Sequence, residues 1–335
     1  MLSLPDSWVW DFWTAELATD AGPEFHLFFL YASKALHDPD RRHVRASVGH
    51  AVSPDLVEWE RVADALVHGQ PGDFDQTATW TGSVVADPAG GWRMFYTGMT
   101  QLPGGQLVQR IGAATSDDLL TWFKVPENPV ITADPRWYET IVETDGQVSG
   151  EEAWRDPFVY ADPSGAGWHM LVTARSSSGP VDDRGVIAHA TSPDLRTWTA
   201  HPPVTRPESG FLHLEVAQVA EVDGRHVLLF DCLGTELTGS HPGRGGVWYL
   251  PLDGPVPDPD RPWDAAAARR LTDEQLYVGK IVDGPAGRPV LMAFHNTAPD
   301  GSFGGVISDP MALRWEGDRL VADPPAGIDW DLSAG

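Results

Sequence analysis

A repeated pattern of Ser, a variable residue, Asp, Leu, two further residues and Trp is the feature that most constrains how this chain folds. It occurs as "GHAVSPDLVEWE" (49–60), "GAATSDDLLTWF" (112–123) and "AHATSPDLRTWT" (188–199), and a degenerate fourth copy, "GGVISDPMALRWE", ends at Trp315. The tryptophans of the first three copies are 63 and 76 residues apart. Ser and Asp side chains stabilise tight turns by accepting hydrogen bonds from nearby backbone N–H groups. The pattern therefore predicts one structural unit that recurs along the chain.

The stretches between these copies are patterned as strands. Residues 79–99, 156–175, 216–233 and 277–296 each read as an apolar strand, a turn and a second strand, and residues 24–33 read as the second half of such a pair. Units of roughly four strands repeated around an axis are the blades of a β-propeller. We therefore predict an all-β fold, a single five-bladed β-propeller over residues 1–335, with blades at about 8–60, 78–123, 155–199, 213–252 and 276–316.

Two other structural readings are weaker. A pair of β-sandwiches would not explain a repeat of this length. Helical periodicity is almost absent, and only "WDAAAARRLTDEQL" (263–276) could form a short helix.

Charge and composition limit the classes of molecule that this chain is expected to bind. The formal net charge is −25, which argues against nucleic acid and anionic membrane surfaces and suits a small neutral ligand such as a sugar. Cys232 is the only cysteine, so no disulfide can form within the chain. The first residues, "MLSLPDSWVWDFW", have no signal-peptide pattern, and the apolar run "FHLFFLYA" is too short to span a bilayer. We expect a cytoplasmic protein without a membrane segment, and the oligomeric state stays open.

The histidines show no metal-binding spacing. None of the 12 histidines falls into an HxH or HExxH pattern, and the Gly-rich stretches lack the strand–helix context of a phosphate-binding loop. We therefore expect no metal and no cofactor.

Three acids stand near the starts of predicted innermost strands, which converge at the centre of a propeller. They are Asp11 in "VWDFW", Asp156 in "WRDPF" and Glu215 in "FLHLEVAQV". Cleavage of a glycosidic bond needs two carboxylates, one ionised and one that donates a proton. A purely structural alternative exists for each: Asp11 and Asp156 could cap turns, and Glu143, Glu151 and Glu152 compete with Glu215 as acids near the same mouth.

Side chains next to these acids are candidates for substrate binding. Arg155 precedes Asp156, so in a regular strand it would point to the opposite face unless a bulge intervenes. His213 lies two residues before Glu215 and is expected on the same strand face. The full set is Trp10, Trp13, Trp80, Ser83, Arg155, His213 and Tyr277.

These motifs resemble those of glycoside hydrolase families 32 and 68 and the related family 43. "VWDFW" looks like the levansucrase-type nucleophile segment, "WTGS" (80–83) like the family's "(W/F)SGS", and "WRDP" like its "RDP" motif, while "LEVAQV" falls where the acid/base Glu lies. The likeness runs over roughly residues 8–316. Leu30 in "FHLFFL" stands where invertases have a sugar-contacting Gln, and we expect a propeller without the β-sandwich appended in family 32.

The resemblance implies roles for the three acids. Asp11 would be the nucleophile, ionised at rest, Asp156 the transition-state stabiliser, and Glu215 the general acid/base, protonated at rest. The implied activity is retaining hydrolysis of β-fructofuranosyl substrates such as sucrose or short fructans. Three alternatives stay open: an inverting family-43-type arabinofuranosidase or xylosidase, a fructosyltransferase, and a non-catalytic sugar-binding propeller.

Overall fold

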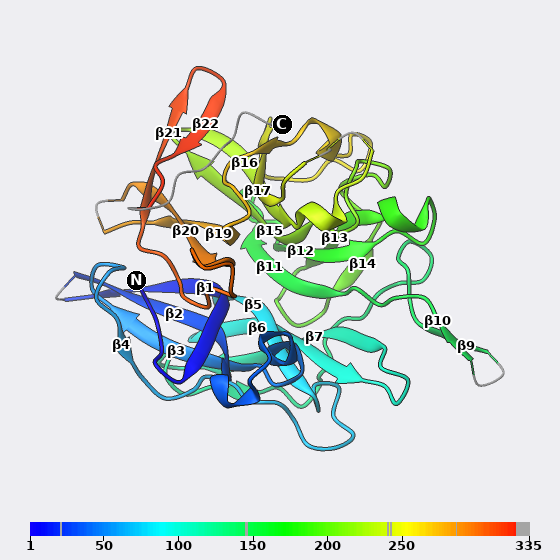
Figure 1. Cartoon of the computed structure of the whole chain (residues 1–335), viewed down its shortest axis with the longest axis horizontal. Helices are drawn as coiled ribbons and strands as arrows, with labels where there is room; N and C mark the ends of the chain where they lie inside the picture. Colours follow the sequence, from blue (N-terminus) through cyan, green and yellow to red (C-terminus); the bar gives the residue numbers. More distant parts are fainter. Residues whose placement is uncertain (21, 145–146, 240, 242, 286, 326–335) are drawn as a thin grey trace.

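Five four-stranded antiparallel sheets are arranged around a central axis, as Figure 1 shows. The computed structural model describes residues 1–20, 22–144, 147–239, 241, 243–285 and 287–325, and it describes no side chains for residues 143–149. Within each sheet the strands follow one another in chain order. The expectation of an all-β, five-bladed β-propeller is confirmed.

Each blade is built from four consecutive strands, with the first of them innermost. Blade 1 holds β1 (Ser7–Thr19), β2 (Gly22–Ser33), β3 (Ser47–Ser53) and β4 (Glu60–Arg61). Blade 2 holds β5 (Ala78–Ala86), β6 (Trp92–Gln101), β7 (Leu107–Ser116) and β8 (Phe123–Lys124). Blade 3 holds β11 (Arg155–Ala161), β12 (Trp168–Arg175), β13 (Gly185–Ser192) and β14 (Thr199–His201). Blade 4 holds β15 (Glu215–Val222), β16 (Arg225–Cys232), β17 (Gly246–Leu252) and β18 (Arg269–Arg270), and blade 5 holds β19 (Leu276–Asp283), β20 (Pro289–His295), β21 (Met311–Glu316) and β22 (Arg319–Ala322).

Blades 4 and 5 extend beyond the ranges expected from sequence. Blade 4 lacks the Ser-x-Asp-Leu-x-x-Trp turn, and its last strand follows a long loop that ends in a 3₁₀ turn, η5 (Ala265–Ala267). Of residues 263–276, which the sequence allowed as a short helix, only this turn is helical. In blade 5, Trp315 lies within β21 rather than after a turn. Residues 326–335 of the predicted domain lie outside the described residues.

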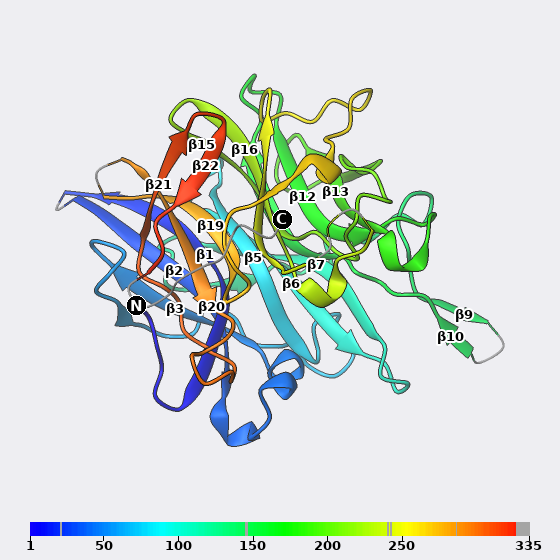
Figure 2. The ribbon, with the colours of Figure 1, turned by 45° about the horizontal axis from the view of Figure 1, so that its top comes forward.

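A small hairpin stands apart from the five blades. It consists of β9 (Val142–Thr144) and β10 (Gln147–Ser149) and projects from the body of the molecule between blades 2 and 3 (Figures 1 and 2). Among the described residues, no helix is both long enough and apolar enough to cross a membrane.

The repeated turn owes its shape to one serine and one aspartate. In the second copy, the Asp118 carboxylate accepts hydrogen bonds from the backbone N–H groups of Leu120 and Thr121 at 2.9 and 2.8 Å. Leu119 takes a left-handed φ of 63° and buries its side chain completely. The Trp122 indole N–H then donates to the Leu119 carbonyl at 2.9 Å. The turn thus fixes both anchors, Leu and Trp, that hold the outermost strand of the blade to the core.

Apolar contacts between neighbouring blades form the core. One cluster joins blades 2 and 3 through residues such as Phe95, Val172 and Ala188. Two others join blades 3 and 4 and blades 4 and 5, and the largest joins blades 5, 1 and 2. Strand β1 closes the ring against blade 5, where the backbone N–H of Val9 donates to the Gly305 carbonyl at 3.0 Å.

Candidate active site

All five innermost strands carry a register irregularity at the same height. The shifts fall between Trp10 and Phe12 in β1, Trp80 and Gly82 in β5, Arg155 and Phe158 in β11, Glu215 and Gln218 in β15, and Tyr277 and Lys280 in β19. A bulge places two successive side chains on the same side of a strand, because it interrupts the alternation of the pleat. This explains how Arg155 and Asp156, which are adjacent in sequence, both face the axis.

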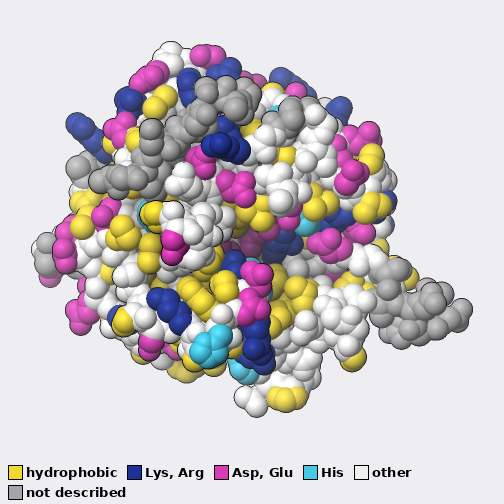
Figure 3. Space-filling model, viewed as in Figure 1, with side chains coloured by type: hydrophobic (Ala, Val, Ile, Leu, Met, Phe, Trp, Pro, Cys, Tyr) yellow, Lys and Arg dark blue, Asp and Glu magenta, His cyan; other side chains and the backbone are white. Residues whose placement is uncertain are grey.

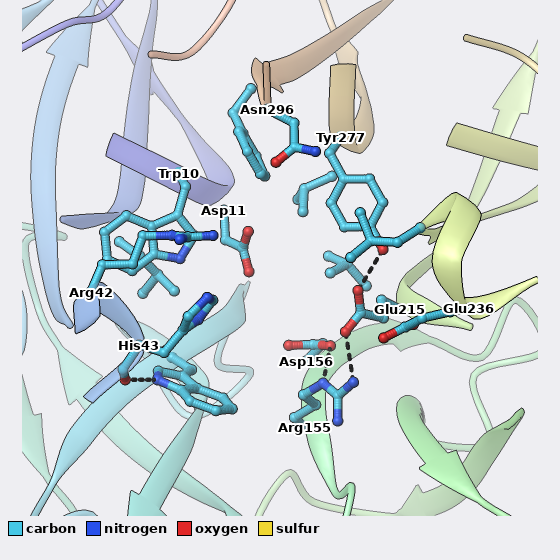
Figure 4. A pocket seen from close by; sticks show the side chains of 16 residues that line it. Trp10, Asp11, Arg42, His43, Arg155, Asp156, Glu215, Glu236, Tyr277 and Asn296 are labelled. Atoms are coloured by element: carbon cyan, nitrogen blue, oxygen red, sulfur yellow. Dashed lines mark hydrogen bonds and ion pairs between the residues drawn. The ribbon is translucent and has the colours of Figure 1, made fainter. Parts of the chain in front are cut away.

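The bulges surround a pocket of about 280 Å³ at one end of the axis. Figure 3 shows the hollow near the middle of this face, with acidic and basic side chains inside it. In Figure 4, Asp11 lies with Trp10, Arg42 and His43 on one side, opposite Glu215, Tyr277 and Glu236. The lining residues are Trp10, Asp11, Leu30, Arg42, His43, Trp80, Arg155, Asp156, Glu215, Val216, Leu233, Glu236, Tyr277, Val278, Phe294 and Asn296.

Asp11 sits against the aromatic side of the pocket. Its backbone φ of 20° falls in the left-handed region, which is uncommon for a residue with a side chain. Thr81 donates a hydrogen bond to its carboxylate at 2.6 Å. Burial, together with the negative charges of Asp156 and Glu215, raises the pKa of Asp11 to about 7.

Asp156 is held by threonines from two blades. Thr173 donates to its carboxylate at 2.8 Å, and its backbone N–H donates to the Thr97 hydroxyl at 2.9 Å. Its φ is 60°. Burial raises the pKa of Asp156, while the Arg155 guanidinium, 3.5 Å away, opposes that rise.

Glu215 is the most completely engaged of the three acids. Arg155 donates to one carboxylate oxygen at 2.6 Å, and the Tyr277 hydroxyl donates to the other at 2.5 Å. Burial pushes the pKa of Glu215 up, but the positive charges of Arg155 and His213 and these hydrogen bonds outweigh burial, so the pKa is lowered. Both oxygens therefore accept hydrogen bonds as a carboxylate should.

The protonation pattern of the free pocket is the reverse of the one implied by resemblance. Asp11 was expected to be ionised and Glu215 protonated, whereas the structure favours a proton on Asp11 and a charge on Glu215. The physical reason is the placement of Arg155, which contacts Glu215 directly. The positive charge of Arg42 only partly offsets the effect of burial on the Asp11 carboxyl.

This arrangement provides the parts that acid–base and nucleophilic chemistry at a sugar requires. Two carboxyl groups with pKa values pushed in opposite directions, Asp11 and Glu215, face one another across a small pocket. One wall is aromatic and suits the C–H face of a ring. Among the described residues, no group of three or more His, Cys, Asp or Glu side chains is arranged to hold a metal ion.

Comparison with known families identifies the chain. The model of the "Glycosyl hydrolases family 32 N-terminal domain" matches residues 18–244, which is more than half of the chain. The chain belongs to glycosyl hydrolases family 32. The match begins after Asp11, so the family 32 model covers Asp156 and Glu215 but not the first acid.

A curated protein is similar to this chain in sequence, and solved structures are similar to it in fold. The insoluble beta-fructofuranosidase isoenzyme CWINV4 of Arabidopsis thaliana is 24% identical over 314 residues, covering 89% of this chain and 48% of its own. Fructan 1-exohydrolase IIa from Cichorium intybus has a TM-score of 0.68 at 21% identity, covering 97% of this chain and 60% of its own. The inulosucrase from Halalkalicoccus jeotgali bound to kestose has a TM-score of 0.69 at 18% identity, covering 95% and 87%. The chain spans between about a quarter and a half of the length of the first curated relatives it matches.

Four of the seven expected binding residues line the pocket of this family 32 chain, namely Trp10, Trp80, Arg155 and Tyr277. Trp13 and Ser83 do not. They line a separate cavity of about 70 Å³ on the axis. Two residues of a strand span almost 7 Å, so Trp13, although on the face of Asp11, lies farther down the axis. The Ser83 hydroxyl accepts the Val159 N–H at 3.1 Å and so joins two blades.

His213 was also expected in the pocket and lies behind its wall. Its two ring nitrogens contact Glu151 at 3.0 Å and Glu236 at 3.1 Å. Burial lowers its pKa, but the two carboxylates outweigh burial and raise it, so His213 is held as a cation between them. Of the acids that compete with Glu215, Glu151 therefore pairs with His213, and Glu152 lies 3.5 Å from Arg110. The side chain of Glu143 lies outside the described ones.

Four polar pocket residues escaped the sequence analysis. Arg42 and His43 come from a 3₁₀ turn, η2 (Pro39–Val44), Glu236 from η4 (Gly234–Glu236), and Asn296 from the loop after β20. All lie in connections rather than at strand starts, so the repeat gave no signal for them. Burial lowers the pKa of His43 to about 4, which leaves its ring neutral beside Trp10 and Trp80. Leu30, noted as a departure from invertases, does line the pocket.

Proposed function

We propose that this protein hydrolyses β-fructofuranosyl bonds in sucrose or short fructans with retention of configuration. The observation that carries the proposal is the meeting of Asp11, Asp156 and Glu215, from three different blades, in one pocket of a family 32 chain. The relatives named beta-fructofuranosidase and fructan exohydrolase support the fructosyl part of the substrate, as does the kestose bound in an inulosucrase of the same fold.

In the proposed reaction, the Asp11 carboxylate attacks the anomeric carbon of the fructosyl group while Glu215 donates a proton to the glycosidic oxygen. The leaving sugar departs with that proton, and a covalent fructosyl ester forms on Asp11. Glu215, now ionised, then takes a proton from water, and the resulting hydroxide equivalent releases fructose and frees Asp11. Asp156 accepts hydrogen bonds from sugar hydroxyls and offsets the positive charge that develops on the ring.

The reactive form needs Asp11 ionised and Glu215 protonated, opposite to the distribution that the free pocket favours. Between the two pKa values the pair carries one proton, and the reactive form is a minor fraction because that proton lies mostly on Asp11 rather than on Glu215. Such a site still gives a bell-shaped profile of kcat/KM against pH, with limbs set by the two macroscopic pKa values. We expect the alkaline limb near pH 7 and the acid limb below pH 4.5.

The test is sugar release from sucrose, kestose, inulin and aryl arabinofuranosides by the wild type and by Asp11→Asn and Glu215→Gln. We expect fructose from the wild type and a loss of about 10²–10⁴-fold in each variant. Asp87→Asn is the matched control, because Asp87 is a buried carboxylate that pairs with Arg93 and Arg196 outside the pocket. This control should keep its activity.

Retention is tested by methanolysis, which should trap the methyl β-fructofuranoside. Arabinose release, or an inverted product, would favour the family-43-type alternative. Folded wild-type protein that releases no sugar from any of these substrates would contradict the proposal. Accumulation of longer fructans from sucrose would favour the transferase.

A further inference from the structure

A hydrogen bond between neighbouring blades recurs at three interfaces, and at one of them a buried aspartate stands where the other two have a threonine. In blades 2 and 3, Thr97 and Thr173 on the second strand accept the N–H of Asp156 and Val216, in the bulge of the next blade, at 2.9 and 3.1 Å. In blade 4 the same position holds Asp231, which accepts the Gly279 N–H at 3.2 Å. Asp231 is fully buried, and its second carboxylate oxygen has no hydrogen-bond partner. Burial raises the pKa of Asp231 well above its ordinary range, and a nearby positive charge opposes that rise.

Lys280 supplies that charge from the innermost strand of blade 5. Its side chain is buried, with 6% of the residue exposed, and it lines the axial cavity beneath the pocket. Its ammonium donates a hydrogen bond to the Val216 carbonyl at 3.2 Å and lies 5.7 Å from the centre of the Phe158 ring. Val216 follows Glu215 directly and has a left-handed φ of 52°.

Strand β19 therefore holds Glu215 at two points. The Tyr277 hydroxyl binds the Glu215 carboxylate, and the Lys280 ammonium binds the backbone immediately after it. Tyr277 and Lys280 flank the register shift of β19, and Glu215 opens that of β15, so the contacts join the two bulges.

The charged groups that act on Lys280 come from three other strands. Burial lowers its pKa to about 8, while Asp231 on β16, Asp156 on β11 and Asp11 on β1 oppose that fall. Burial raises the pKa of Asp156, and raises that of Asp231 well above its ordinary range, while the charge of Lys280 opposes both rises. Glu215 on β15 also belongs to this group because its charge raises the pKa of Asp231, and Tyr277 on β19 contacts Glu215 through its hydroxyl. One cation thus serves several carboxylates.

We propose that Lys280 is a positioning residue that fixes the backbone after Glu215 and supplies the positive charge beneath the pocket acids. Its effect on catalysis rests on the proposed function. Its coupling to the carboxylates does not, so the two are tested separately.

The first experiment measures the pKa of Lys280 by NMR in protein labelled at the lysine side chains. The chain has only three lysines, Lys34, Lys124 and Lys280, so Lys34→Arg and Lys124→Arg assign the signals by subtraction. Replacing a carboxylate that stabilises the ammonium should lower the Lys280 pKa. We expect a fall of about one unit in each of Asp156→Asn and Asp231→Asn, and no change in Asp87→Asn. An unchanged pKa in both variants would overturn the proposal, whatever the protein's substrate.

The second experiment compares the pH profile of fructose release in Lys280→Met, Lys280→Arg and the control Lys124→Met. Lys124 also donates to a backbone carbonyl and an aspartate, Val67 and Asp75, but outside the pocket. We expect Lys280→Met to move the alkaline limb up by about one pH unit and to lower kcat/KM at pH 6 about tenfold, and Lys280→Arg to recover most of the loss.

If the alkaline limb of kcat/KM lies at the same pH in Lys280→Met and in the wild type, Lys280 has only a structural role and the proposal is overturned. If Lys280→Met does not fold, the NMR titration of Asp156→Asn and Asp231→Asn decides. If the wild type releases no fructose, the proposed function fails while the NMR coupling still tests Lys280.

Discussion

Asp11 shows how a single side chain can be placed at the expense of stability. It is partly buried, lies near two other acids and has a left-handed backbone, and the positive charge of Arg42 compensates only in part. A carboxyl whose pKa is raised on folding weakens the folded state wherever it must be ionised. The ionised Asp11 carboxylate is therefore less stable in the folded protein than in the unfolded chain.

Replacing Asp11 with the neutral, nearly isosteric Asn should stabilise the protein at high pH. In the unfolded chain Asp11 titrates near 3.8 and in the fold near 7, so at pH 8 both states are ionised and the fold bears the full cost. At about 1.4 kcal/mol per unit, Asp11→Asn should raise the free energy of unfolding at pH 8 by up to about 4 kcal/mol. Urea unfolding measures this directly.

The same gain should nearly disappear at pH 4, where Asp11 is already protonated in the fold. Asp87→Asn should have the opposite sign: burial raises the pKa of Asp87, but the Ala89 N–H and the Arg196 and Arg93 guanidinium groups outweigh burial and lower it. An Asp11→Asn variant no more stable than wild type at pH 8 would contradict the electrostatics described for the pocket.

Tyr277→Phe tests the hydrogen bond that keeps Glu215 ionised. Without the hydroxyl, 2.5 Å from the Glu215 carboxylate, the charged form loses a donor and the pKa of Glu215 should rise. We expect the acid limb of kcat/KM to move up by about one pH unit, the equivalent of one hydrogen bond to a charged group. The control is Tyr96→Phe, whose hydroxyl donates to Asp75 in blade 2, and which should leave both limbs in place. A stationary acid limb in Tyr277→Phe would disprove the assignment.

At this scale the sequence indicated the three acids because they stand at equivalent points of a repeat. It did not indicate which neighbours share the pocket, because a bulge changes the face of each residue near it. Trp13 and His213 each lie two residues from an acid, yet Trp13 lies deeper on the axis and His213 behind the wall. The pocket residues from loops, such as Arg42 and Glu236, depend on loop conformations that no periodicity encodes.

At the scale of the element, the repeated turn separates stability from activity. Asp118 binds two backbone N–H groups of its turn and lies far along the blade from the axis. Asp118→Ala should lower the free energy of unfolding, since the turn loses two hydrogen bonds. The loss should be only about 1 kcal/mol, because the exposed N–H groups can bind water instead. Asp117→Ala, the adjacent exposed aspartate of the same turn, should have little effect, and fructose release should be unchanged in both. Equal losses in the two variants would mean that the turn does not depend on this aspartate.

The strands that the sequence placed best are those bounded by this turn. Blades 1 to 3 each have the motif, and its Leu and Trp fix where the outer strand begins. Blade 4 lacks it, and β18 could not be located because a long loop leaves the strand only two residues to pair. Local chemistry thus predicts an element well where the turn itself is specified by side chains.

At the scale of the whole molecule, two blades contain a chain of a partly exposed carboxylate and two buried histidines. In blade 1, Glu24 contacts His26 at 3.1 Å and His26 contacts His50 at 3.0 Å. In blade 3, Asp162, His169 and His189 repeat the arrangement at 3.0 and 2.9 Å. The sequence analysis found no metal spacing among the histidines but did not anticipate these pairs, which form across neighbouring strands.

These pairs should make the propeller sensitive to acid. Burial lowers the pKa of both His50 and His189 to about 3, whereas the unfolded residues titrate near 6.5. The contribution of each to stability is complete above pH 6.5 and is lost as the pH falls toward 3, by about 2 kcal/mol per histidine between pH 6.5 and 5. The raised pKa of Asp11 acts in the opposite direction over the same range.

The histidine effect is therefore isolated by comparing the pH dependence of unfolding in wild type with that in His50→Gln and His189→Gln. The variants should lose less stability on acidification, while the exposed control His68→Gln should follow the wild type. Parallel curves for all four proteins would show that these histidines stay out of the acid transition.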